Sequence, residues 1–128
     1  MWRVAVYAHE APGRRAQALL DRQVAHLATG VARRPGWWHV ATYAEESFTV
    51  GWRPGLARLL ADAPGRLDII AVDAHRRLSV DRGERDAILA QLAMAGVTTV
   101  ALGPSAARRL VALAAEVALV DLIDDALR

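Results

Sequence analysis

The sequence of 128 residues contains neither cysteine nor lysine. The absence of cysteine excludes disulfides, thiolate zinc sites and a cysteine nucleophile. Because lysine is absent, all 16 basic residues are arginine, whose guanidinium group stays charged and binds phosphate or carboxylate through paired N–H donors. Charges or glycines interrupt each apolar run before it reaches the roughly 18 residues of a membrane-spanning helix. We therefore expect a cytoplasmic, bacterial-type protein without a membrane partner.

The composition favours a compact globular protein. Hydrophobic residues make up 54% of the chain and charged residues 23%, which excludes a disordered chain. Basic residues number 16 and acidic residues 14, so the net charge of +2 does not by itself indicate a nucleic-acid partner. We expect one domain over residues 1–128.

Apolar periodicity alternates between strand-like and helix-like segments. The runs typical of strands are Trp2 to Ala8, Trp38 to Ala44, Leu67 to Asp73 and Val97 to Leu102. The patterns typical of helices are Arg14 to Val31, Pro54 to Asp62, Asp81 to Met94 and a long C-terminal helix from Ser105 onward. This alternation predicts an α/β fold of three layers, with a mostly parallel sheet of four to five strands. We expect the run from Val97 to Leu102 to be an inner strand, buried on both faces.

Three segments carry motifs in a defined order. They are Arg3-Val-Ala-Val-Tyr-Ala8, then Arg53-Pro-Gly-Leu-Ala-Arg-Leu-Leu-Ala-Asp62, then Leu67-Asp-Ile-Ile-Ala-Val followed by Arg77-Leu-Ser79. Together they resemble the catalytic domain of the serine recombinases, the resolvase and invertase family. The resemblance covers most of the chain from Arg3 to Leu102 and implies a resolvase-like fold.

The resemblance implies a nucleophile that this sequence lacks. In the family, a serine just past the first strand attacks the scissile DNA phosphate, whereas this chain has Ala11 at that position. A methyl group cannot form the covalent intermediate. Ser47, Ser79 and Ser105 are the other hydroxyls considered, but Ser79 lies within a turn and Ser105 suits a helix N-cap. We therefore predict a catalytically inactive recombinase-like protein.

The resemblance also implies a reduced set of anion-binding residues. Arg53 and Arg77 match family arginines, whereas His9 and Val80 stand in place of two others and Arg76 replaces an aspartate. We expect weak, salt-dependent DNA or phosphate binding at Arg53, Arg77, Arg76 and His9. In the family a DNA-binding domain follows the catalytic domain, and we expect no separate DNA-binding domain in this chain.

The polar residues at and just beyond the ends of the first and third predicted strands support a second interpretation. His9, Glu10 and Asp73 are acid–base residues, so the alternative is a small α/β enzyme that acts on an anionic substrate held by the two matching arginines. Together with His75, these residues are also of the types that ligate metal ions. Their spacing follows no metal-ligand signature, and we expect no metal and no cofactor.

Arginine pairs and tryptophans raise the question of a nucleic-acid face. The pairs Arg14-Arg15, Arg33-Arg34 and Arg76-Arg77 fall at positions that cannot all share one edge of the sheet. Trp37, Trp38 and Trp52 offer surfaces on which bases could stack, but aromatic residues beside strands more often belong to core or rim packing. The prediction of DNA binding therefore depends on Arg53 and the Arg76-Arg77 pair.

The C-terminal helix carries the prediction of a partner. Between Leu110 and Leu127 the acidic residues fall within one half-turn, and the apolar surface is wider than packing on one sheet face requires. In the resembled family the corresponding helix forms the dimer. We therefore predict a symmetric homodimer, with DNA and an intact recombinase or another regulator as the further partners considered.

Overall fold

The computed structural model describes residues 1–48 and 51–104. In chain order its elements are β1 (Trp2–Glu10), α1 (Ala16–Ala32), β2 (Trp37–Glu46), α2 (Pro54–Asp62), β3 (Ile69–Val72), a short 3-10 helix η1 (His75–Arg77), α3 (Arg82–Met94) and β4 (Thr98–Ala101). The strands form one sheet in the order β2-β1-β3-β4, and all three neighbouring pairs are parallel. The prediction of an α/β fold with a parallel sheet is confirmed.

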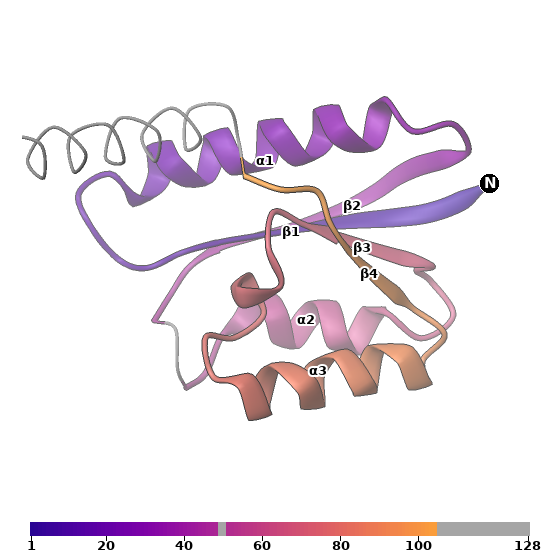
Figure 1. The fold of residues 1–128 in the computed structure, drawn as a ribbon. Helices are drawn as coiled ribbons and strands as arrows, with labels where there is room; N and C mark the ends of the chain where they lie inside the picture. Colours follow the sequence, from indigo (N-terminus) through magenta and orange to yellow (C-terminus); the bar gives the residue numbers. More distant parts are fainter. Residues whose placement is uncertain (49–50, 105–128) are drawn as a thin grey trace, which may run out of the picture.

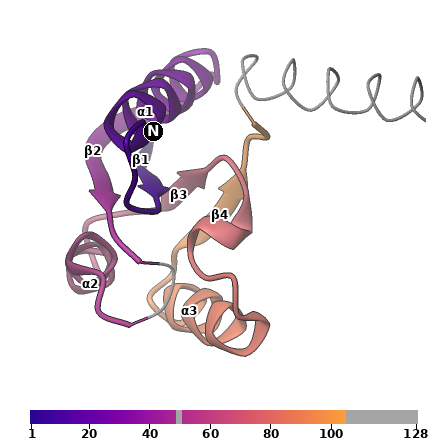
Figure 2. The same ribbon diagram turned by 90° about the vertical axis from the view of Figure 1, so that its left-hand side faces the viewer.

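The sheet separates two apolar layers (Figure 1). Helix α1 covers one face, and α2 and α3 cover the other, which is clearest when the ribbon is viewed along the sheet (Figure 2). On the α1 side, Val4 and Val6 of β1 pack with Leu20 and Leu27 of α1. On the opposite side the core is larger and includes Tyr7, together with residues of α2, β3 and α3. The strictly alternating side chains of β1 thus serve both layers, because successive residues of a strand point to opposite faces.

The observed element boundaries differ from the predicted ones mainly in the strands. Strand β1 continues to Glu10, because β2 runs alongside it as far as the pair of Glu10 with Glu46. Strand β3 is shorter than predicted and begins at Ile69. Helix α2 has the predicted bounds, with Pro54 at its first turn, where the missing N–H costs no hydrogen bond.

The prediction that the run from Val97 to Leu102 is an inner strand is wrong within the described residues. There β4 pairs only with β3, and Thr98 and Ala101 are exposed. A short run of β-branched residues looks alike in an inner strand and in an edge strand, so the sequence alone did not separate the two.

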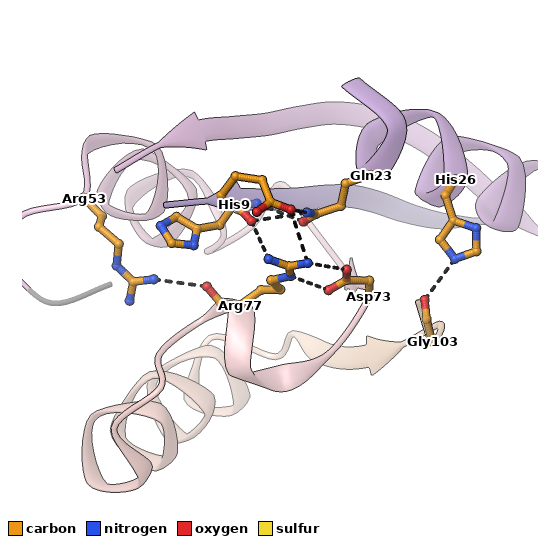
Figure 3. Close-up of polar contacts among 8 residues, drawn as sticks. His9, Gln23, His26, Arg53, Asp73, Arg77 and Gly103 are labelled. Carbon is orange, nitrogen blue, oxygen red and sulfur yellow. Dashed lines mark hydrogen bonds and ion pairs between the residues drawn. The ribbon is translucent and has the colours of Figure 1, made fainter. Parts of the chain in front are cut away.

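The end of β4 is fixed against α1. The His26 ring and the Gly103 carbonyl oxygen lie 2.9 Å apart (Figure 3), and Leu102 approaches Gly30 so closely that a Cβ there would lie 2.7 Å from the leucine Cδ1. The helix predicted from Ser105 and the dimer surface predicted between Leu110 and Leu127 lie outside the described residues. Within residues 1–48 and 51–104, no helix is long and apolar enough to cross a membrane.

Candidate functional site

Arg77 occupies the centre of a polar cluster where β1 and β3 end (Figure 3). Its guanidinium group binds both carboxylate oxygens of Asp73, at 2.8 and 2.9 Å, and donates to the His9 carbonyl oxygen at 2.8 Å. A carboxylate oxygen of Glu10 lies 3.5 Å away. The Arg77 and Asp73 side chains are only 9% and 4% exposed. Each guanidinium nitrogen of this arginine therefore has a partner within the protein.

Gln23 of α1 forms hydrogen bonds with the last two residues of β1. Its side-chain amide accepts from the His9 N–H at 2.9 Å and donates to the His9 carbonyl oxygen and to Glu10, both at 3.2 Å. Gln23 is buried on the helix face that also presents Leu20 and Leu27 to the sheet. A polar amide in that apolar environment is stabilised only when it is fully hydrogen-bonded, which these contacts achieve.

Arg53, just before α2, is buried as deeply as Arg77. Its guanidinium group donates to the carbonyl oxygens of Arg77 and Leu78, and it lies 3.5 Å from a carboxylate oxygen of Glu84. Only 3% of Arg53 is exposed. The Nε atom is buried, and no described residue accepts a hydrogen bond from it. Arg53 thus ties the segment before α2 to the turn after η1.

Glu45 of β2 connects the cluster to the start of α2. Its carboxylate accepts from the N–H groups of Gly55 and Leu56 at the start of α2, at 3.0 and 2.7 Å, and from the Tyr7 hydroxyl at 2.6 Å. A carboxylate at this position satisfies otherwise unpaired helix N–H groups. Burial and the hydrogen bond to Glu45 raise the pKa of Tyr7, so its phenol stays protonated.

The His9 side chain points away from Arg77. Its ring nitrogen Nε2 lies 2.9 Å from the Ser47 carbonyl oxygen, and the residue is 3% exposed. Burial lowers the pKa of His9, the hydrogen bond to Ser47 opposes this, and the charge of Arg53 adds to the lowering. His9 is therefore a neutral hydrogen-bonding group at neutral pH rather than a cation.

Of the serines considered as replacement nucleophiles, the two within the described residues, Ser47 and Ser79, have no exposed hydroxyl. Ala11 is exposed just past β1. The Ser79 side chain is fully buried, and its Oγ accepts from the Asp81 N–H at 3.1 Å. The Ser47 Oγ is buried as well and has no hydrogen-bond partner among the described residues. Ser105 lies outside them.

The electrostatic balance of the cluster does not favour an anion. The two guanidinium groups of Arg53 and Arg77 lie among four carboxylates, those of Glu10, Asp73, Glu84 and Glu45. Carboxylates therefore outnumber guanidinium groups in the cluster. A phosphate entering here would have to displace carboxylates that already occupy the guanidinium donors.

The predicted site residues separate into two groups. Arg53, Arg77 and His9 lie buried in one region, together with Glu10 and Asp73, whereas Arg76 and His75 are exposed on η1. In the part of the chain that the structure describes, no three His, Asp or Glu side chains are placed to hold a metal ion.

Sequence reasoning missed Gln23 and Glu45. A signal for Gln23 exists, because it takes a position in the apolar stripe between Leu20 and Leu27, where a polar residue implies a buried partner. Glu45 and Glu46 are the last two residues of β2, so their place at a strand end is a signal that both share. Only the tertiary position of α2 distinguishes them, because Glu45 accepts from its first N–H groups.

The comparison with solved structures concerns the fold. The chain has a serine recombinase-like fold, because catalytic domains of that class match it over most of its length in solved structures. No protein-family model matches the sequence. No curated protein matches it either.

Three solved structures illustrate the similarity. The C-terminal catalytic domain of ISC1926 TnpA, an IS607-like serine recombinase, has a TM-score of 0.70 at 19% identity and covers 87% of this chain and 77% of that chain. The corresponding domain of IS1535 TnpA has a TM-score of 0.62 at 29% identity, with 79% and 71% covered. The N-terminal catalytic domain of TP901-1 integrase has a TM-score of 0.69 at 22% identity, with 78% and 77% covered. The catalytic domain thus stands at either end in these proteins, and the domain order assumed from the sequence is not general.

Proposed function

We propose that this chain is a catalytically inactive serine recombinase-like protein that acts by binding, in an accessory or regulatory role. The observation that carries the proposal is the state of the two matching arginines. Arg53 donates to backbone carbonyl oxygens, and Arg77 is enclosed by Asp73, Glu10 and the His9 carbonyl. Phosphoryl transfer requires several cations that converge on one phosphate and a nucleophile beside it. Ala11 supplies no nucleophile.

The alternative of a small acid–base enzyme has less support. Glu10 and Asp73 both neutralise Arg77, and the His9 ring is bonded to a backbone carbonyl. General acid–base catalysis needs these groups within reach of a substrate proton. Their present contacts stabilise the fold instead.

Weak DNA or phosphate binding at this edge remains part of the proposal, with roles divided among the residues. Arg76 is the exposed cation, whereas Arg53, Arg77 and His9 hold the turn that presents it. One exposed guanidinium supports a weak, salt-sensitive contact with duplex DNA. The wider proposal is a cytoplasmic protein that dimerises through residues 110–127 and associates with an intact recombinase or another regulator.

The absence of chemistry is tested with supercoiled plasmid. We expect neither nicked plasmid nor a covalent protein–DNA adduct after prolonged incubation, and the Ala11→Ser variant tests whether the nucleophile alone is missing. Because Arg53 and Arg77 are occupied by protein contacts, we expect Ala11→Ser to remain inactive. Cleavage by the unaltered chain would refute the proposal.

The DNA contact is tested by titrating duplex DNA at about 50 and about 200 mM salt. We expect Arg76→Ala to weaken binding and to reduce the slope of log affinity against log salt by about 1. Arg22→Ala removes an exposed arginine of α1, away from η1, and is the charge-matched control. Equal affinities of the two variants would argue against a duplex contact at η1.

A further inference from the structure

Tryptophan and arginine side chains gather at the end of the sheet where the parallel strands begin. This amino-edge surface consists of Trp2, Trp37, Trp38, Arg33, Arg34 and Arg66. Figure 1 shows the start of β1 and the α1–β2 connection at the same end of the sheet, away from the site around Arg77. The surface therefore lies outside the site described above.

Trp2 and Trp37 lie side by side at the starts of β1 and β2, and Trp38 is the next residue of β2. Trp2 of β1 is the register partner of Trp37 of β2, and the Trp2 N–H donates to the Gly36 carbonyl oxygen at 2.6 Å. Trp38 is the partner of Arg3 and follows on the opposite face of the sheet. Trp2 and Trp38 are 58% and 57% exposed. Side chains of this size are rarely left in water without a binding role when they gather together.

The arginines of this surface are not neutralised. Arg33, Arg34 and Arg66 are exposed, and none of them forms an ion pair within the described residues. Arg34 instead lies over the Trp37 ring, 4.8 Å from its centre. Arg66 lies near the start of β1, because Arg3 of that strand donates to the carbonyl oxygen of Gly65, the residue before Arg66.

The carboxylates at this end already have partners. Asp68 forms an ion pair with Arg3 at 3.1 Å, and Asp62 accepts from the Tyr43 hydroxyl at 2.7 Å. The Asp62 carboxylate keeps its charge, because its partner is a neutral hydroxyl, but Arg33, Arg34 and Arg66 outnumber it. The amino-edge surface therefore has a net positive charge, which is complementary to an anionic partner.

We propose that the amino-edge surface binds single-stranded nucleic acid. Exposed tryptophans stack on unpaired bases without regard to sequence, and arginines pair with the phosphates between them. A duplex hides the faces of its bases, so it would use the arginines and leave Trp2 and Trp38 unused. An acidic peptide would likewise meet the charges but gain little from the indole rings. Aromatic and cationic groups occur together here, which favours a partner that has both flat bases and phosphates.

The test is a titration of fluorescein-labelled oligodeoxythymidylate of about 20 nucleotides at low salt, followed by anisotropy and by tryptophan quenching. We expect Trp2→Ala and Trp38→Ala each to weaken binding about 5- to 100-fold, and Trp38→Phe to retain most of it. Arg66→Ala should reduce the salt dependence by about one ion, and Arg66→Lys should restore it. Both tryptophans are exposed, and circular dichroism of each variant verifies that the fold is intact.

Two controls separate this surface from the site around Arg77. Trp52→Ala removes a tryptophan that is 78% exposed just before α2, and Arg22→Ala removes an exposed arginine of α1 that belongs to neither site. Neither should change oligonucleotide affinity by more than about twofold. Absence of binding at low salt would overturn the proposal, as would equal losses in Trp52→Ala and Trp38→Ala. It would also be overturned if duplex DNA or polyglutamate bound as tightly as the oligonucleotide.

Discussion

At the end of the sheet where the strands finish, Arg77 is enclosed by two carboxylates and a backbone carbonyl, whereas at the other end Arg33 and Arg66 extend into solvent. The residue type is the same, and burial makes the difference. A buried guanidinium has to be paired within the protein, because an unpaired charge in the interior is costly. An exposed one stays hydrated and available to a partner. The arginines that match the recombinase motifs are thus less accessible to a binding partner than the exposed arginines at the other end of the sheet.

The largest effect is expected from breaking the pair of Arg77 and Asp73. Asp73→Ala leaves a buried guanidinium without its two-oxygen partner, and we expect the free energy of unfolding to fall by about 3–5 kcal/mol. Urea denaturation measures this loss. Asp86→Ala, which removes an exposed carboxylate 4.0 Å from Arg82, is the matched control and should cost no more than about 0.5 kcal/mol. Similar losses in the two variants would mean that burial does not make the ion pair of Arg77 more important for stability than that of Arg82.

A second large effect is expected at Gly55. A Cβ at this position would lie 2.8 Å from the Glu45 carboxyl group, so Gly55→Ala displaces the carboxylate that accepts from α2 and from Tyr7. We expect the free energy of unfolding to fall by about 1–3 kcal/mol. Gly13→Ala is the control, since nothing lies within 4 Å of the added methyl group. Equal stability of the two variants would show that Glu45 is not needed there.

The neutral state of His9 predicts a pH dependence. Its pKa is lowered in the folded protein, so between that value and about 6.5 the unfolded chain binds a proton that the folded chain does not. Stability is therefore lost as the pH falls below about 6.5, by at most about 1.4 kcal/mol per pH unit. Urea midpoints at about pH 7.5 and about pH 5.5 should differ less for His9→Gln than for the unaltered chain. The same difference in His9→Gln and in the unaltered chain would contradict this prediction.

The fold was more predictable than the cluster, for physical reasons. Apolar periodicity is a local property, so it located every described α-helix and strand to within a few residues, whereas η1 was not predicted. The pair of Asp73 and Arg77 is also local, four residues apart across a turn. By contrast, the bonds from Arg53 to the turn after η1 and from Gln23 to His9 join segments 24 and 14 residues apart. Such contacts depend on how the helices pack on the sheet, which residue spacing does not encode.

The smallest effect is expected at Arg34, and it completes the comparison between the two ends of the sheet. Arg34→Ala removes the guanidinium from the Trp37 ring, an exposed contact that contributes about 0.5–1 kcal/mol. Arg33→Ala, its neighbour without such a contact, should change stability by less than about 0.5 kcal/mol. Urea denaturation of both variants provides the measurement. A loss of stability in Arg34→Ala as large as that in Asp73→Ala would show that Arg34 is needed for the fold. A small loss is expected if its charge is available to a binding partner.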